Sequence, residues 1–552
     1  MAAAIALAFV PAAVLAQEGN LPLKYKAQPT RAAITAGDLM SRLYIFADDS
    51  MMGREFGTEG NLKATAYIAK EMKRLGLKPA GDDGYYQWVP TALVSFNPAS
   101  QMMIGSRALV AGKDFVASNP RGGVPRSFDS LQVVYGGDLS DTTNLLNSAT
   151  TSGKAVVLMM RGSTQTTRRL VGRYNNAAAV ITVGQPRSRR SYSITDPNAP
   201  QVPASITVSP AVVGQLFKLP AGQMTPPPVG STGQTLYFQS FGLTRDPARA
   251  RNIVAILRGS DPKLRREYVA IGAHNDHLGF GAPVDHDSLR TWNVLANRIV
   301  EARTHQTPGG PGGGLTVEER ASIHVNVDSL HRLRPARMDS VYNGADDDGS
   351  GSVGVLEIAE AFAKAKVRPK RSIIFVFHTG EEAGLLGSQW FTDHPTVPRD
   401  SIVAQLNVDM IGRGDAFDYA SKSANGSESY LQLVGSRRLS TELGDLIESV
   451  NKTERYPMTF DYAIDANGHP ERIYCRSDHA NYARYGIPVT FFTTGLHMDY
   501  HQLTDEPQYI DYTHMAHVTE LVYDVAGRVA NLDHRVALDR PKPTDSRAAC
   551  VQ

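Results

Sequence analysis

The amino-acid sequence predicts an α/β fold: a mostly parallel, twisted sheet with helices on both faces, plus a small inserted β-rich domain. Two observations predict the sheet. Apolar runs of strand length recur after residue 250, and helical patterns lie between several of them. A third observation predicts the insert, because residues 109–240 change to short Val-rich runs between Ser, Thr, Pro and Gly residues.

The first predicted elements are helical, over residues 35–77, where apolar residues recur at helical spacing until Gly76 and Pro79. A later helix is predicted over residues 353–366. Long apolar strands joined by helices indicate a parallel sheet that is buried on both faces. The predicted strands span residues 252–257, 268–274, 372–378, 402–410 and 487–495.

A chain of 552 residues is too long for one ordinary core, so we expect more than one folding unit. We assign residues 17–108 and 241–552 to a discontinuous main domain and residues 109–240 to the insert. Residues 278–342, which contain Thr307-PGGPGGG, separate two strongly patterned regions. We interpret them as an insertion loop near the functional site.

The first sixteen residues are apolar and end in small residues before Gln17, a pattern typical of a signal peptide. They lack a positively charged start, and the alternative is a cytosolic N-terminal helix. We therefore expect a periplasmic or secreted protein with no stable membrane insertion after the signal peptide, residues 1–16, is cleaved. The sequence carries no signal of oligomeric state.

Composition excludes several classes of function. Lys and Arg number 57 against 55 Asp and Glu, and no basic stretch contains interleaved aromatic residues, so nucleic acid is not an expected partner. The two cysteines, Cys475 and Cys550, cannot form a thiolate metal site, which needs a cluster of cysteines. We expect them to be unpaired, with a single disulfide bridge as the alternative. Any metal chemistry must use His, Asp and Glu.

Polar residues follow the predicted strands at the edge where ligands collect in open α/β sheets. A neutral imidazole there is a good zinc ligand, and adjacent carboxylates can divide metal coordination and water activation between them. Taken singly, each residue has a structural explanation, such as a buried histidine or an acidic helix start. The residues are His274 and Asp276 after one strand, Glu381 and Glu382 after another, Asp409 after a third, and His501 after the last.

Three adjacent carboxylates stand in the segment Asn343-GADDDGSG, where a cation is expected to compensate their repulsion. The residues Asp346, Asp348, Ser350 and Glu357 also fit the spacing of a calcium loop. Pro335 and Gly344 stand where that loop needs an entering helix, and no second loop pairs with it. The flanking sequence therefore weighs against calcium.

Taken together, the ordered motifs H-x-D, GADDDGSG, GEE, NVDM and DYH resemble those of the co-catalytic zinc peptidases. That family includes bacterial leucyl aminopeptidases, glutamate carboxypeptidases and the transferrin receptor ectodomain. The resemblance extends from about residue 35 to residue 532 and includes an apparent protease-associated domain at 109–240. It implies a zinc-exopeptidase fold.

The resemblance also implies roles for individual residues. His274 and Asp409 would bind one zinc, Glu382 and His501 would bind a second, and Asp346 would bridge the two ions. Asp276 would orient His274, Glu381 would be the general base, and Tyr474 would contact the substrate oxyanion. The family pattern further implies a cis peptide bond between Asp346 and Asp347.

The function implied by the resemblance is removal of N-terminal residues from peptide substrates by a metallo-aminopeptidase with two Zn²⁺ per chain. Carboxypeptidase or dipeptidase activity is the alternative within the same fold, although no motif identifies cations for a substrate carboxylate. Glutaminyl cyclases share the fold but use a single zinc, so the five-ligand pattern weighs against that activity. From another class, a receptor-like or calcium-binding ectodomain would keep the fold without catalysis.

Overall fold

The computed structural model describes residues 21–119, 123–159, 172–196, 198–220, 225–306, 315–413, 429–546 and 550–552. The proposed signal peptide at 1–16 lies outside the described residues. The chain forms two compact units, one from Met1–Val89 with Arg249–Gln552 and one from Pro90–Ala248. The second unit is longer at both ends than the expected insert at 109–240, and on the N-terminal side the added residues include β3 (Gln101–Ile104), which pairs with β14 (Leu236–Ser240) in a sheet of that unit.

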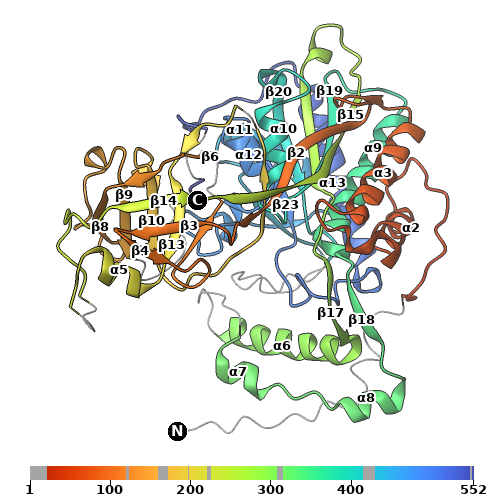
Figure 1. Cartoon of the computed structure of the whole chain (residues 1–552). Coiled ribbons are helices and arrows are strands. Elements are labelled where there is room, and N and C mark those ends of the chain that lie inside the picture. The colour runs from red at the N-terminus through yellow and green to blue at the C-terminus, as the bar shows by residue number, and fades with distance from the viewer. Residues whose placement is uncertain are drawn as a thin grey trace. The chain divides into compact units, whose positions relative to one another are not determined.

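A twisted sheet forms the centre of the first unit (Figure 1). Four neighbouring strands, β19, β16, β20 and β23, run parallel, whereas β15 and β21 pair antiparallel at their two sides. Every residue of β19 and β20 is buried, as expected for strands covered on both faces. Seven of the ten strands that the described residues form in this sheet are β15 (Leu243–Leu257), β19 (Ser372–His378), β16 (Tyr268–His274), β20 (Ile402–Val408), β23 (Val489–Thr493), β21 (Tyr430–Val434) and β22 (Thr459–Asp461), and the other three are β1 (Lys78–Pro79), β2 (Tyr86–Phe96) and β11 (Ser191–Ile194).

Helices cover both faces of this sheet, as the sequence predicted. Alternate residues of β15 enter different cores: Ile253 packs in the core formed with the first set of helices, and Val254 packs in the other. Helix α9 is buried almost throughout because it packs against α2, α3, α13 and the sheet. The first set is α2 (Ala36–Phe46), α3 (Glu59–Arg74), α9 (Gly351–Lys364), α11 (Thr441–Asn451) and α13 (Tyr512–Asn531), and the second is α10 (Leu386–Asp393) and α12 (His479–Ala483).

Residues 278–342 are not the single loop that the sequence suggested. Strands β17 (Gly279–Asp285) and β18 (Met338–Tyr342) pair antiparallel, and the described residues between them form three helices. The pairing satisfies the backbone hydrogen-bonding groups of the two strands, which a long unstructured loop would leave to water. Figure 1 shows the helices beyond the ends of the two strands. They are α6 (His286–Gln306), α7 (Val317–Ser322) and α8 (Val327–Leu333).

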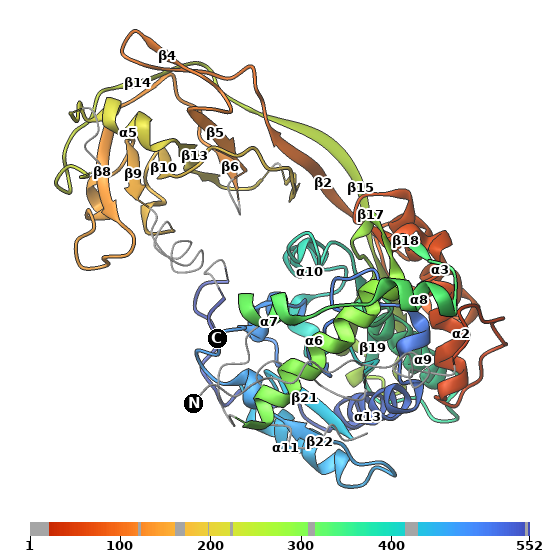
Figure 2. The same cartoon turned by 90° about the horizontal axis from the view of Figure 1, so that it is seen from below.

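The second unit is rich in β structure, with the short helix α5 (Pro210–Leu216) beside its main sheet (Figure 2). That sheet has the order β5-β13-β10-β9-β8 and mixes parallel and antiparallel pairs. A second sheet has the order β4-β3-β14-β7. The strands are β3 (Gln101–Ile104), β4 (Arg107–Leu109), β5 (Phe115–Ser118), β7 (Ser130–Leu131), β8 (Val133–Asp138), β9 (Ala155–Met159), β10 (Ala179–Val183), β13 (Ala204–Val208) and β14 (Leu236–Ser240).

The two cysteines form a disulfide bond, so the expectation that they are unpaired was wrong. Cys475 and Cys550 lie 75 residues apart in the chain, and their Cα atoms are 5.7 Å apart. Sequence separation gave no signal for this pairing, which depends on the C-terminal residues returning to the segment before α12. Among the described residues, no helix has both the length and the apolar character needed to cross a bilayer.

Candidate metal centre

The carboxyl ends of the parallel strands bring together the polar residues that the sequence singled out. His274 is the last residue of β16, Glu381 and Glu382 follow β19, Asp409 directly follows β20, and His501 lies after β23. In parallel strands these ends share one edge of the sheet, so residues distant in sequence become neighbours. Together with Asp347 and His277 they form a buried His–carboxylate cluster.

Asp347 lies at the centre of this cluster. Its Oδ1 is 3.1 Å from Nε2 of His274, and its Oδ2 is 3.0 Å from Nε2 of His501. Asp409 faces the first imidazole at 3.7 Å, and Glu382 faces the second at 3.1 Å. Burial alone would raise the pKa of Asp347, but the adjacent imidazoles of His274 and His501 hold it well below its ordinary value. The central carboxylate is therefore ionised.

Asp346, the bridging ligand expected from the sequence, does not occupy that place. Its Oδ1 accepts hydrogen bonds from the backbone N–H of Gly412 and the hydroxyl of Ser350, and its Oδ2 lies 3.0 Å from Nε2 of His497. These partners hold its carboxylate away from His274 and His501. Asp347 takes the central position instead, and the cis peptide bond lies one residue later than expected, between Asp347 and Asp348.

Asp348 has a third role. Its carboxylate accepts hydrogen bonds from the backbone N–H groups of His274 at 2.8 Å, Gly351 at 2.9 Å and Met410 at 3.3 Å. It thereby ties the end of β16 to the start of α9 and to the end of β20. The three adjacent carboxylates thus divide their work: the outer two fix the backbone and neighbouring side chains, and only Asp347 faces the cluster.

His277 is a member of the cluster that the sequence reasoning missed. Its Nδ1 lies 2.9 Å from Oε1 of Glu382 and 3.8 Å from Oδ2 of Asp347. The signal that could have found it is a second histidine, three residues after His274, in the segment that follows the same strand.

Asp276 orients the cluster through two different groups. Its backbone carbonyl lies 3.1 Å from Nδ1 of His274, whereas its carboxylate is farther from that nitrogen, at 3.8 Å. The carboxylate accepts hydrogen bonds from the backbone N–H groups of Glu381 at 3.1 Å and Glu382 at 3.3 Å. A proton on Nδ1 of His274 leaves Nε2 free to coordinate a metal, so Asp276 fixes both the imidazole and the acidic pair.

Tyr474 is not among the residues that line the cavity beside the cluster, whereas Tyr500 is. The Tyr474 ring is buried under the guanidinium of Arg438, 4.4 Å above it, and lies against His479. The Tyr500 ring stacks on His501 with centroids 3.8 Å apart. Burial and the charges of nearby carboxylates raise the pKa of Tyr500 far above its ordinary value, so this phenol stays protonated and can donate a hydrogen bond.

The donor atoms of the cluster fit divalent metal ions. Asp347 belongs to two groups of three residues, one with His274 and Asp409 and the other with His277 and Glu382. In each group, three donor atoms, one from each residue, lie within 4.8 Å of one another. In the described part of the chain, Asp347, Glu382 and Asp409 form ion pairs only with imidazoles. Buried carboxylates without a full cation are costly, and a metal ion removes that cost. Five buried donor atoms have no hydrogen-bond partner: Nδ1 and Nε2 of His277, Oδ2 of Asp347, Oε1 of Glu382 and Nε2 of His501.

A cavity opens on one side of the cluster. His274, Asp347, Glu381 and Asp409 form its acidic end. Its other walls are mainly apolar, and they place side chains next to the candidate metal ligands, where a bound substrate would lie. These wall residues include Met410, Ile464, Ile473, Phe491 and Leu496.

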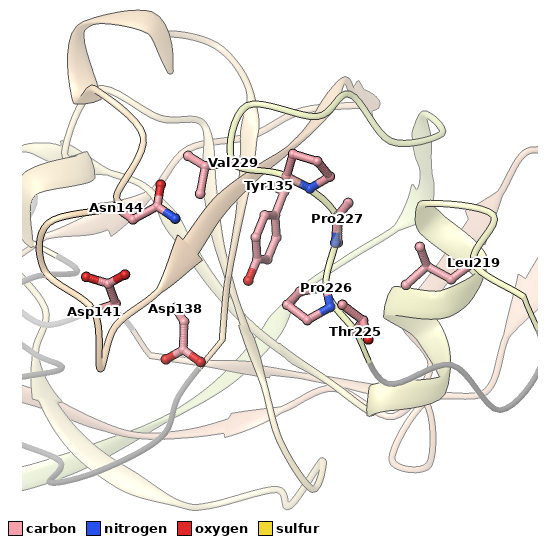
Figure 3. A pocket seen from close by; sticks show the side chains of 10 residues that line it. Tyr135, Asp138, Asp141, Asn144, Leu219, Thr225, Pro226, Pro227 and Val229 are labelled. Atoms are coloured by element: carbon pink, nitrogen blue, oxygen red, sulfur yellow. The ribbon is translucent and has the colours of Figure 1, made fainter.

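Two further features lack the same chemistry. His286, Asp339 and Glu506 converge in the first unit, but the guanidinium of Arg337 already pairs with Glu506 through contacts of 2.8 and 2.7 Å. The second unit contains a cavity of about 600 Å³, shown in Figure 3. Its lining combines Tyr135, Asp138 and Asp141 with prolines and contains no histidine. Neither feature assembles an unpaired set of metal donors.

A buried His–carboxylate cluster at the carboxyl edge of a parallel α/β sheet defines the class of site, a candidate two-metal centre. Residues 324–526 match the model of peptidase family M28. This match confirms the family resemblance recognised from the ordered motifs. It includes Asp347, Glu381, Glu382, Asp409 and His501, whereas His274 and His277 precede it.

Proteins similar in sequence or structure to this chain are named as peptidases. Leucine aminopeptidase 1 of Paracoccidioides brasiliensis (strain Pb18) is 31% identical over 217 residues, which are 37% of this chain and 51% of that protein. A vacuolar membrane protease of Candida glabrata is 37% identical over 127 residues, which are 22% of this chain and 13% of that protein. The chain spans about half the length of the leucine aminopeptidase it matches. The solved aminopeptidase from Aneurinibacillus sp. strain AM-1 is 17% identical, with coverage of 92% and 96% and a TM-score of 0.47.

Proposed function

We propose that this protein is a zinc-dependent aminopeptidase with two metal ions in one centre. The observation that carries the proposal is the position of Asp347, between the imidazoles of His274 and His501. His274 and Asp409 would hold one ion, Glu382 and His501 the other, and Asp347 both. Histidine nitrogens and carboxylate oxygens without thiolates are a donor set that zinc accepts.

Bound zinc ions would supply Lewis acidity, lowering the pKa of a coordinated water to about 7 and polarising the peptide carbonyl. Glu381 lines the cavity together with His274, Asp347 and Asp409, and it is the carboxylate best placed to move a proton there. Burial raises the pKa of Glu381 well above its ordinary value, and the charges of Glu382 and Asp409 add to this against the opposing His274. Such a carboxyl can accept a proton from water and deliver it to the leaving amine.

The lining of the cavity bears on which end of a peptide is attacked. A carboxypeptidase needs a cation for the substrate carboxylate. Arg476 lines the cavity, but its guanidinium pairs with Glu471 at 2.9 Å. The name of the similar leucine aminopeptidase agrees with attack at the amino end.

The test compares amino-acid p-nitroanilides that carry a free α-amine with their N-acetylated forms. We expect hydrolysis of the free-amine substrates, loss of activity on chelation and recovery when zinc is returned. Hydrolysis of the acetylated substrates alone would overturn the aminopeptidase assignment. Activity that survives complete removal of metal would overturn the metal mechanism.

We also propose that the protein is periplasmic or secreted, with residues 1–16 as its signal peptide. The disulfide between Cys475 and Cys550 supports this location, because such bonds persist in oxidising compartments. N-terminal sequencing of the protein purified from its host tests the proposal. A mature chain that begins near Gln17 is expected, and retention of residues 1–16 would contradict it.

A further inference from the structure

His277 has a buried imidazole for which the five-ligand scheme has no use. The residue is 1% exposed, and neither ring nitrogen has a hydrogen-bond partner among the residues that the structure describes. Nδ1 nevertheless lies 2.9 Å from Oε1 of Glu382 and 3.8 Å from Oδ2 of Asp347. A buried polar ring without hydrogen bonds costs free energy unless another partner compensates it.

The surrounding backbone makes room for this ring and holds it in place. Gly344 has a φ of +54°, and a Cβ atom at that position would lie 2.5 Å from the His277 ring. The backbone N–H of His277 donates to the carbonyl of Arg54 at 3.2 Å, and the guanidinium of Arg54 donates to the carbonyl of Gly344 at 2.8 Å. Any larger residue at 344 would displace the imidazole.

The two halves of the cluster therefore offer different numbers of donors. The half next to the cavity has His274, Asp409 and the shared Asp347, and all three residues line that cavity. The other half has Glu382, His501, the shared Asp347 and also His277. Of these four residues, only Asp347 lines the cavity. Zinc sites that bind substrate or water keep an open position, whereas sites with four protein ligands are closed.

We propose that His277, through Nδ1, is an additional ligand of the ion held by Glu382 and His501. This inference rests on the proposed metal centre. The ion beside Glu382 then has four protein ligands, and the ion beside His274 has three and an open position facing the cavity. The two ions consequently have separate roles: the first is held by protein alone, and the second is accessible to water and substrate.

A cysteine substitution tests coordination directly, with a spectroscopic readout that does not depend on activity. The protein contains no free cysteine, so a new thiol at position 277 is unique. A metal–sulfur bond of about 2.3 Å is longer than a metal–nitrogen bond of about 2.0–2.1 Å, which offsets the shorter side chain. In the His277→Cys variant loaded with Co²⁺, a thiolate-to-cobalt charge-transfer band is expected.

The matched control is His497→Cys, because His497 is also buried but its Nε2 contacts Oδ2 of Asp346, outside the cluster. Neither this variant nor the wild type should show the band. A second variant, His277→Gln, should bind the second equivalent of Co²⁺ at least about tenfold more weakly than the wild type.

The outcomes separate the inference from the function on which it rests. Wild-type protein that binds two equivalents of Co²⁺, together with a His277→Cys variant that binds cobalt without the band, would overturn the role of His277 and leave the two-metal centre intact. Unchanged affinity in His277→Gln would have the same meaning. Wild-type protein that binds no Co²⁺ would overturn both.

Discussion

Oδ1 of Asp347 lies 3.1 Å from Nε2 of His274. The other oxygen of the same carboxylate faces His501, so one side chain joins two groups of donors that come from different strand ends. The contact depends on the neighbours of Asp347. The carboxylate of Asp346 accepts a hydrogen bond from the backbone N–H of Gly412, and that of Asp348 accepts one from the backbone N–H of His274. The carboxylate between them therefore faces the imidazoles.

The role of Glu381 as the proton carrier predicts a separation between metal binding and turnover. Glu381→Gln should retain the metal content of the wild type and lower kcat by about 10²–10⁴-fold, because it removes the group that accepts the proton of the attacking water. Steady-state kinetics and elemental analysis of the same preparation measure both quantities.

The control for this variant is Glu318→Gln, which changes an exposed carboxylate on α7 and should alter neither quantity. Wild-type turnover in Glu381→Gln would remove Glu381 from the mechanism. Loss of metal would instead indicate that its carboxylate is a ligand.

The buried guanidinium of Arg42 joins α2 to α9 and α3, and its loss should destabilise the first unit. Its side chain is 2% exposed and pairs with Glu71, Glu357 and Glu360. Glu71 and Glu360 keep Arg74 as a partner, but Arg42→Met leaves the buried Glu357 without its cation, which costs about 3–5 kcal/mol. We expect a lower thermal midpoint and a lower urea midpoint.

The comparison is with Arg74→Met, because Arg74 pairs with the same Glu71 and Glu360 but its side chain is 42% exposed. Exposed ion pairs contribute about 0–1 kcal/mol, so this variant should unfold close to the wild type. Equal midpoints for the two variants would show that burial of Arg42 is not what gives its ion pairs their strength.

The disulfide between Cys475 and Cys550 should contribute measurably to stability, because it closes a loop over a sequence separation of 75 residues. Restricting the unfolded chain by a loop of that length is worth about 4.5 kcal/mol in the chain-entropy model. The Cys475→Ser/Cys550→Ser variant should therefore melt at a lower temperature than the oxidised wild type.

Reduction provides the internal control for the disulfide. A reductant should lower the melting temperature of the wild type and leave that of the double variant unchanged. If the reduced and oxidised wild-type proteins melt together, the bond does not constrain the unfolded chain as this reasoning requires.

The sequence predicted the parallel strands well because β19 and β20 are mainly apolar along their length, as is typical of strands in a sheet buried on both faces. It also predicted that His274, Glu382, Asp409 and His501 would lie together, since each follows a strand that ends at the same edge. These predictions rest on local patterns and on one rule of sheet topology.

The remaining features depend on contacts that local patterns do not encode. Which of the adjacent carboxylates 346–348 faces the cluster is decided by Gly412 and by Asp505, whose carboxylate accepts from the backbone N–H of Asp346 and Asp347. The position of His277 depends on the space that Gly344 leaves. The β17–β18 pairing and the disulfide each join segments through tertiary contacts, which spacing alone does not reveal.

The central claim, that Asp347 joins two metal ions, is tested most directly by the metal content of three purified proteins after equilibration with zinc and gel filtration. We predict two zinc ions per chain for the wild type, at most one for Asp347→Asn, and about two for Asp346→Asn, whose carboxylate lies outside the cluster. Two ions retained by Asp347→Asn, or ions lost from Asp346→Asn instead, would contradict the account.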